Sequence, residues 1–421
     1  MLEIPAILFN CVAIFGYINY RYLKLPLTVG LAIIALLSTM LIILVDNFYP
    51  HLGIVNILRQ FLDNIDFNRT LMEGMLCFLL FAGALHINLD DLLKSKFQVG
   101  ALASIGVLIS SMINGLGFYG LTQLFGFDID IITCFLFGVI VSPTDPVAVM
   151  SVLKRIKIPV PLKTTIAGES LFNDGFVVVL YSILVTTIFG DSANQHESMN
   201  VANVIGIFIH EAFGGVILGL IAGYLTFLLL KSIDDYIVEI ITTLALVTGA
   251  YTLSLYIHVS GPIAMVVSGI LIGNTGMRLA MSESTKIHVT SFWHLIDEIL
   301  NAVLFVLIGF EIIMLSNEKE VLLISLFAIL VSLCGRWLAV FIPIKCLNII
   351  SKKEKGTISI LTWAGLRGGI SVALALALPI NVDKPIILTA TYAVVLFTIL
   401  IQGLSIEYLI KYVYKERQDT I

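Results

Sequence analysis

The sequence is poor in charge and in cysteine, and each shortage excludes a class of protein. Only 13% of its 421 residues are charged, and the net charge of −5 gives no indication of a nucleic-acid partner. The five cysteines lie in apolar segments without a CxxC pair, so neither a disulfide framework nor a cysteine-bound metal cluster is expected. No basic leader with a small-residue cleavage site precedes the first apolar run, so we expect the N-terminus to be retained. Hydrophobic residues make up 58% of the chain, which indicates a polytopic membrane protein.

The apolar runs predict an all-α membrane protein, because a crossing needs about 20 apolar residues. We expect about thirteen transmembrane helices, at residues 2–20, 25–45, 70–88, 97–124, 129–154, 161–190, 200–230, 235–257, 260–277, 288–316, 320–347, 357–380 and 385–411. Of the 24 Lys and Arg residues, 18 fall in loops on one side, which is therefore expected to be cytoplasmic. An odd number of crossings then places the N-terminus outside and the C-terminus in the cytoplasm. Two arginines, Arg336 and Arg367, lie within apolar segments.

Residues 168–175 place two carboxylates inside the sixth crossing. The pairs Glu169/Asn173 and Ser170/Asp174 are spaced i, i+4, so on a helix they form one polar stripe. An ionisable side chain near the bilayer centre costs roughly 2.5–3.5 kcal/mol on insertion scales, so it normally marks an ion or proton path. The alternative is a structural ion pair between helices, for which the two intramembrane arginines are the candidate partners.

Two crossings are interrupted. The fifth breaks at residues 141–146, where Asp145 precedes Pro146 as an N-cap precedes a proline at the first helical position, and the twelfth breaks at residues 365–369. Crossings 4–6 and 11–13 are offset by seven, so they run in opposite directions, as inverted repeats do, and paired interruptions point to a transport site. Asp145 could neutralise positive helix ends and Arg367 negative ones. The alternative is two kinked helices with no shared axis.

No enzyme active site is expected. Residues 168–172 superficially resemble a nucleophile elbow but lack its second glycine and a preceding strand. His210 and Glu211 begin like a zinc-protease motif, but Gly214 stands where the second histidine belongs.

Two further polar groups lie near predicted membrane boundaries. Glu73, near the outer end of the third crossing, reaches either the interface or the ion path. His288, His294, Asp297 and Glu298 lie near the inner end of the tenth crossing, and we expect them to be structural or to line the mouth of a funnel.

Over nearly the whole chain the sequence resembles the NhaP-type cation/proton antiporters, relatives of the animal sodium/proton exchangers. The most specific matches are residues 142–146 and 168–175, and residues 301–309 and 365–379 match as well. Residues 81–89 resemble the family's FEGGL-type stretch, although Ala82 stands where an acid is common.

The resemblance implies roles for individual residues in a family with inverted repeats and two broken helices. Asp174 is implied to bind the cation and the proton alternately. Thr144, Asp145 and Ser170 are implied to complete the Na⁺ shell, with Glu73 as a further candidate.

The same resemblance assigns the neighbouring residues of the stripe. Asn173 fills a position that is Asn in electroneutral members, which implies exchange of one cation for one proton. Glu169 is implied to pair with an arginine, and position along the eleventh crossing favours Arg336. Arg367 would then serve the ends of the crossed half-helices.

The predicted domain organisation is a scaffold and a core. The scaffold, expected to form a homodimer by resemblance only, comprises residues 1–96 and 197–317, and the ion-transport core comprises residues 97–196 and 318–415. Residues 416–421 form a short cytoplasmic tail, so no large regulatory tail is expected.

The sequence therefore predicts a secondary active transporter in a bacterial or archaeal cell membrane. It would exchange Na⁺ or Li⁺ for H⁺ by alternating access, because a buried carboxylate can be neutralised by either a proton or a hard cation. No cofactor is expected. A K⁺/H⁺ antiporter of the same fold is the alternative. A passive cation channel would use the same residues, but paired broken helices suit alternating access better.

Overall fold

The computed structural model describes residues 3–63, 70, 74–153, 158–189, 201–315, 318–347, 356–379 and 383–418. Within these ranges every regular element is a helix, so the predicted all-α fold class is confirmed. The first half comprises α1 (Glu3–Ile18), α2 (Leu27–Phe48), α3 (Ile54–Asp63), α4 (Leu76–Leu85), α5 (Leu89–Ala101), α6 (Val107–Leu124), α7 (Ile131–Ile140), α8 (Val147–Leu153) and α9 (Val160–Phe189). The second half comprises α10 (Val201–Lys231), α11 (Tyr236–Tyr256), α12 (Gly261–Leu271), α13 (Met277–Leu279), α14 (Glu283–Phe310), α15 (Lys319–Leu347), α16 (Thr357–Trp363), α17 (Gly369–Leu376), α18 (Lys384–Phe397) and α19 (Gly403–Gln418).

Nine helices among the described residues are long and apolar enough to cross a membrane. Three of them join consecutive elements through a π-helical turn: α5 continues into α6, α12 into α13, and α18 into α19. Two shorter apolar helices, α4 and α7, and the 28-residue α14 also lie within predicted crossings. Within the described residues each predicted crossing overlaps one of these helices or a pair of half-helices.

The fourth crossing begins earlier than its apolar run. The helix starts at Leu89 rather than at residue 97, because Asn88 caps it by accepting a hydrogen bond from the Asp91 N–H (3.1 Å). The Asn274 side chain also accepts from the Leu89 N–H (2.8 Å) and donates to the Ile87 carbonyl (2.9 Å). Hydropathy does not detect this polar first turn, which side-chain capping stabilises.

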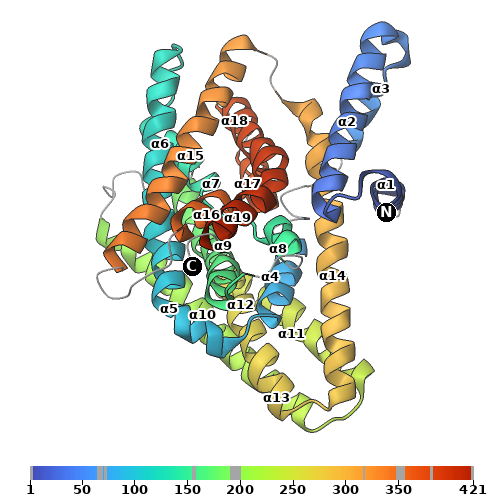
Figure 1. Cartoon of the computed structure of the whole chain (residues 1–421), viewed down its shortest axis with the longest axis vertical. Coiled ribbons are helices and arrows are strands. Elements are labelled where there is room, and N and C mark those ends of the chain that lie inside the picture. The colour runs from blue at the N-terminus through green and yellow to red at the C-terminus, as the bar shows by residue number, and fades with distance from the viewer. Residues whose placement is uncertain are drawn as a thin grey trace.

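The helices pack as two groups around the interrupted crossings. In Figure 1, α2 and α14 run along one flank and α6 and α15 along the opposite flank, with α8, α17 and α18 between them. One buried apolar cluster joins α2, α6, α7, α17, α18 and the C-terminal half of α14, whereas a second joins α4, α10, α11, α12 and the N-terminal half of α14. Helix α14 therefore contributes to both clusters.

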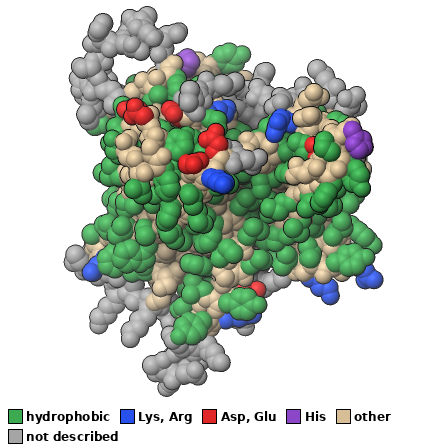
Figure 2. Space-filling model, turned by 90° about the horizontal axis from the view of Figure 1, so that it is seen from above, with side chains coloured by type: hydrophobic (Ala, Val, Ile, Leu, Met, Phe, Trp, Pro, Cys, Tyr) green, Lys and Arg blue, Asp and Glu red, His purple; other side chains and the backbone are tan. Residues whose placement is uncertain are grey.

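The outer surface is consistent with a lipid environment. Figure 2 shows hydrophobic side chains in a broad band, with charged side chains gathered above and below it. Large apolar side chains are exposed along α2, α10 and α11, where burial against protein would normally be expected. Such exposure is expected of a surface that contacts lipid.

Both predicted interruptions are present, and they meet. Helix α7 ends at Ile140 and α8 begins at Val147, while α16 ends at Trp363 and α17 begins at Gly369. The Asp145 N–H in the first break donates to the Leu366 carbonyl in the second (2.7 Å). Unwound backbone at membrane depth must find partners within the protein, and here each break supplies one for the other.

Candidate functional site

The polar stripe of α9 lies against the first helix break. Glu169, Ser170, Asn173 and Asp174 are all buried, with exposed fractions between 1% and 7%. All four come from one face of an unbroken 30-residue helix, so their relative positions are fixed by the helix itself. The i, i+4 spacing read from the sequence thus produces a contiguous buried polar surface.

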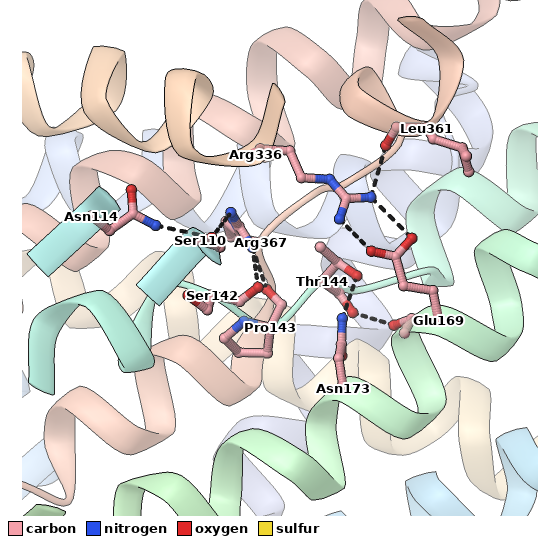
Figure 3. A network of polar contacts seen from close by, with 11 residues as sticks. Ser110, Asn114, Ser142, Pro143, Thr144, Glu169, Asn173, Arg336, Leu361 and Arg367 are labelled. Carbon is pink, nitrogen blue, oxygen red and sulfur yellow. Dashed lines mark hydrogen bonds and ion pairs between the residues drawn. The ribbon is translucent and has the colours of Figure 1, made fainter. Parts of the chain in front are cut away.

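Thr144 receives two side chains of this stripe. The Ser170 hydroxyl donates to the Thr144 carbonyl, and the Asn173 amide donates to the Thr144 hydroxyl (2.8 Å; Figure 3). These bonds satisfy the unwound backbone and hold it against α9. They also gather carbonyl, hydroxyl and amide oxygens in one place, which is the ligand chemistry that hard cations prefer.

Asp145 lies where two positive helix ends converge. Its Oδ1 accepts a hydrogen bond from the Val147 N–H (2.8 Å) at the start of α8, so the carboxylate caps that half-helix. Its Oδ2 lies against Gly368, the residue that precedes α17, where a methyl group would collide with the carboxylate. Asp145 can therefore compensate the N-terminal ends of both α8 and α17.

Arg367 occupies the corresponding negative end. Its Nη1 donates to the carbonyls of Ser142 and Pro143 (the latter at 3.2 Å), which follow the C-terminus of α7. Its backbone N–H donates to the Thr398 hydroxyl (3.0 Å). The guanidinium is 1% exposed, and these carbonyls provide the negative potential that such a buried cation needs.

Glu169 and Arg336 form a buried ion pair. Arg336 Nη1 and Nη2 contact Glu169 Oε1 and Oε2, the second pair at 3.1 Å, which gives a bidentate arrangement (Figure 3). Arg336 Nη2 also donates to the Leu361 carbonyl (2.8 Å) in α16. Arg336 thus joins α15, α9 and the half-helix α16.

A cavity of about 520 Å³ reaches the place where the two helix breaks meet. Near the breaks it is lined by Thr144, Asp145, Ser170, Asp174 and residues 368–371. Farther along, its lining includes His86, Lys163, His294, Asp297, Glu298 and Asn301. Four residues of α14 were expected to be structural or to line the mouth of a funnel. Three of them, His294, Asp297 and Glu298, line the same cavity as residues of the α9 stripe, whereas His288 is not part of its lining.

Asp174 is the one acid of the stripe with no partner of its own. Glu169 is paired with Arg336, whereas the part of the chain that the structure describes offers Asp174 neither a hydrogen bond nor an ion pair. Its carboxylate is 7% exposed and lines the cavity. A buried, unpaired carboxylate is costly unless a proton or a cation neutralises it.

Not every predicted site residue can be placed, and some polar residues were not anticipated. Glu73 lies outside the described residues. Helix α6 places three buried polar residues next to the first helix break: Ser110, Ser111 and Asn114. Ser111 Oγ lies 2.9 Å from Ser142 Oγ in that break. Their signal was available, because Ser110 and Asn114 are polar residues spaced i, i+4 within an apolar run.

The donor set suits an alkali cation better than a transition metal. No group of three or more His, Cys, Asp or Glu residues that could hold a metal ion occurs in the described ranges. Around Asp174 the available ligands are oxygens, which match small hard cations such as Na⁺ and Li⁺.

Comparison with known proteins identifies a family that covers nearly the whole chain. Residues 11–412 match the family model described as sodium/hydrogen exchanger, transmembrane. The chain is 43% identical over 420 residues to the Na⁺/H⁺ antiporter NhaP of Pseudomonas aeruginosa, covering 98% of this chain and 97% of that one. It is 34% identical to the Na⁺/H⁺ antiporter NhaH of Halobacillus dabanensis, covering 82% and 83% of the two chains.

A solved structure matches the fold. The sodium proton antiporter MjNhaP1 from Methanocaldococcus jannaschii superposes with a TM-score of 0.74 over 96% of this chain and 99% of that one, at 20% sequence identity. At this identity the match supports the arrangement of the helices alone. Together with the family match across nearly all residues, it shows that the chain is a multi-pass membrane protein that belongs to the sodium/hydrogen exchanger family.

Proposed function

We propose that the chain is a secondary active antiporter that exchanges Na⁺ or Li⁺ for H⁺ across a cell membrane. The observation that carries the proposal is Asp174, a buried carboxylate that lines the cavity and has no partner among the described residues. The relatives named as Na⁺/H⁺ antiporters support the choice of ions.

In the proposed site Asp174 binds either the proton or the cation. Thr144, Asp145 and Ser170 line the same cavity, and Asn173 bonds to the Thr144 hydroxyl, so these residues would supply further oxygens to the ion. One oxygen of Asp145 already accepts a hydrogen bond from the start of α8, so Asp145 would bind the ion less strongly than Asp174 does. Competition between H⁺ and the cation for one carboxylate then couples the two fluxes.

The balance of charge beside the two helix breaks supports electroneutral exchange. Three carboxylates, Glu169, Asp145 and Asp174, face two guanidiniums, Arg336 and Arg367, which leaves one negative charge when all are ionised. One bound proton or one monovalent cation neutralises it. Since moving a net charge through an apolar barrier is expensive, only the loaded site would reorient readily.

We further propose a division of labour between the helices. The core would comprise residues 97–196 and 318–415, which include α6 to α9 and α15 to α18, and the scaffold residues 1–96 and 197–317, which include α1 to α4 and α10 to α14, with the scaffold forming a homodimer. The Lys- and Arg-rich loops support a cytoplasmic C-terminus and an external N-terminus. The cavity would then face the cytoplasm, because its lining includes Lys163, near the start of α9 and among the basic residues of that side, and His86, which follows the end of α4.

The test is ion exchange in vesicles that contain the purified protein. With an imposed pH gradient, addition of Na⁺ or Li⁺ should collapse the gradient for the natural sequence, and K⁺ is assayed alongside to identify the preferred cation. The Asp174→Ala variant should give no exchange while eluting as a folded, monodisperse protein. Asp128→Ala, which removes an exposed loop carboxylate, is the matched control and should exchange normally. Sodium-dependent collapse that survives in Asp174→Ala would refute the assignment.

A further inference from the structure

Helix α6 presents a buried polar face to the end of the half-helix α7. Ser110, Ser111 and Asn114 are 2%, 5% and 0% exposed, although the helix around them is apolar. The two helices approach closely here, because a methyl group on Gly138 of α7 would collide with the Ser111 carbonyl. The polar face is therefore held within reach of residues 142–145.

This face contacts Arg367 through the terminal nitrogen that does not bind the carbonyls following α7. Arg367 Nη2 donates to the Ser110 hydroxyl (3.4 Å), while Nη1 donates to Ser142 and Pro143. The Asn114 amide donates to the same Ser110 hydroxyl (3.1 Å; Figure 3). Ser110 thus stands between Asn114 and the guanidinium.

Asn114 also lies against the helix that carries the other buried arginine. A methyl group on Gly335 of α15 would lie 2.9 Å from Asn114 Oδ1, and this oxygen accepts no hydrogen bond from the described residues. A buried amide with an unsatisfied oxygen costs stability compared with an apolar residue of the same shape. Packing alone does not account for an asparagine at this position.

We propose that Ser110 and Asn114 are positioning residues for the ion site. They hold the Arg367 guanidinium at the C-terminal end of α7, and through it they hold the unwound segment 142–145 that supplies Thr144 and Asp145 to the cavity. Asn114 acts through Ser110 by fixing the orientation of its hydroxyl. The inference rests on the proposed exchange function and adds to it residues that do not line the cavity.

The experiment compares Ser110→Ala, Asn114→Leu and the double variant in vesicles with an imposed pH gradient. Loss of one hydrogen bond in the support of the guanidinium should raise the apparent KM for Na⁺ about fivefold in Ser110→Ala and about threefold in Asn114→Leu. The maximal rate should stay within about twofold, because Asp174 itself is untouched. Since Asn114 acts through Ser110, the double variant should resemble Ser110→Ala instead of showing the product of the two effects.

Two controls separate positioning from general damage. Ser325→Ala removes a buried hydroxyl that, among the described residues, bonds only to the Val321 carbonyl of its own helix (2.8 Å), and the KM of this variant should be unchanged. Ser110→Thr keeps the hydroxyl and should restore most of the Na⁺ affinity. Asn114→Leu removes an unsatisfied oxygen, so its melting temperature should hold or rise while its KM worsens.

The possible failures are distinguishable. An unchanged KM in both single variants, or a lower melting temperature in Asn114→Leu with normal KM, would overturn the positioning role. Independent, multiplying effects in the double variant would overturn the claim that Asn114 acts through Ser110. Absence of exchange in the natural sequence would instead count against the proposed function.

Discussion

Breaking the ion pair between Glu169 and Arg336 should destabilise the protein strongly. In Glu169→Gln the guanidinium keeps the Leu361 carbonyl and an amide oxygen but loses its counter-charge while 7% exposed. Removing one partner of a buried pair typically costs about 3–5 kcal/mol. Arg336→Met should cost more, because it also leaves the Leu361 carbonyl without its donor, adding about 1–3 kcal/mol.

The double variant distinguishes a coupled pair from two independent losses. With Glu169→Gln and Arg336→Met together, neither charge is left buried alone, so the cost should fall below the sum of the single effects by at least about 2 kcal/mol. The assay is the temperature at which half of the detergent-solubilised protein remains monodisperse. The exposed pair Glu407–Lys411 (2.6 Å) is the control, since i, i+4 surface pairs contribute only about 0.3–0.5 kcal/mol. Strictly additive losses, or an unchanged midpoint in Glu169→Gln, would refute the reasoning.

Three further predictions follow from neighbouring contacts. Asn173→Asp adds a second unbalanced charge, so exchange should become sensitive to an imposed membrane potential; a rate independent of potential in this variant would contradict the charge balance. Gly368→Ala places a methyl group against the Asp145 carboxylate and should abolish Na⁺-dependent exchange, whereas Gly249→Ala, with open space around it, should exchange normally. Lys384→Met removes the donor to the carbonyls of Leu376 (2.8 Å) and Leu378 (2.7 Å) at the end of α17. It should lower the melting midpoint, because charged hydrogen bonds contribute about 1.5–3 kcal/mol; an unchanged midpoint would show that water replaces this cap.

Much of the fold could be predicted because membrane helices follow simple rules. Apolar length located the crossings, and proline and glycine located the two interruptions, since both residues act on the chain locally. The beginning of the fourth crossing was missed because it depends on a cap at Asn88 and on the distant Asn274 side chain. Hydropathy has no access to such contacts.

The site was accessible from sequence only in part. The face of α9 follows from helical spacing alone, so the grouping of its four polar residues could be derived. The second contact of Arg336, with the Leu361 carbonyl, depends on how α15 passes the end of α16. The role of Ser110 likewise depends on the close approach of α6 and α7, which two isolated polar residues in an apolar run do not reveal.

The hydrogen bond from Asp145 in one break to Leu366 in the other has a mechanical consequence. Together with Arg367 at the end of α7 and Arg336 at the end of α16, it fastens the crossed segments into a single cassette. Pulling the segments apart would strand several buried donors and acceptors at once, so we infer that the cassette travels whole. An ion bound to these segments would then keep the same oxygen ligands while the site reorients. The free-energy cost of reorientation would arise from the packing of the apolar surfaces around the segments, because the ion would not have to lose its ligands on the way.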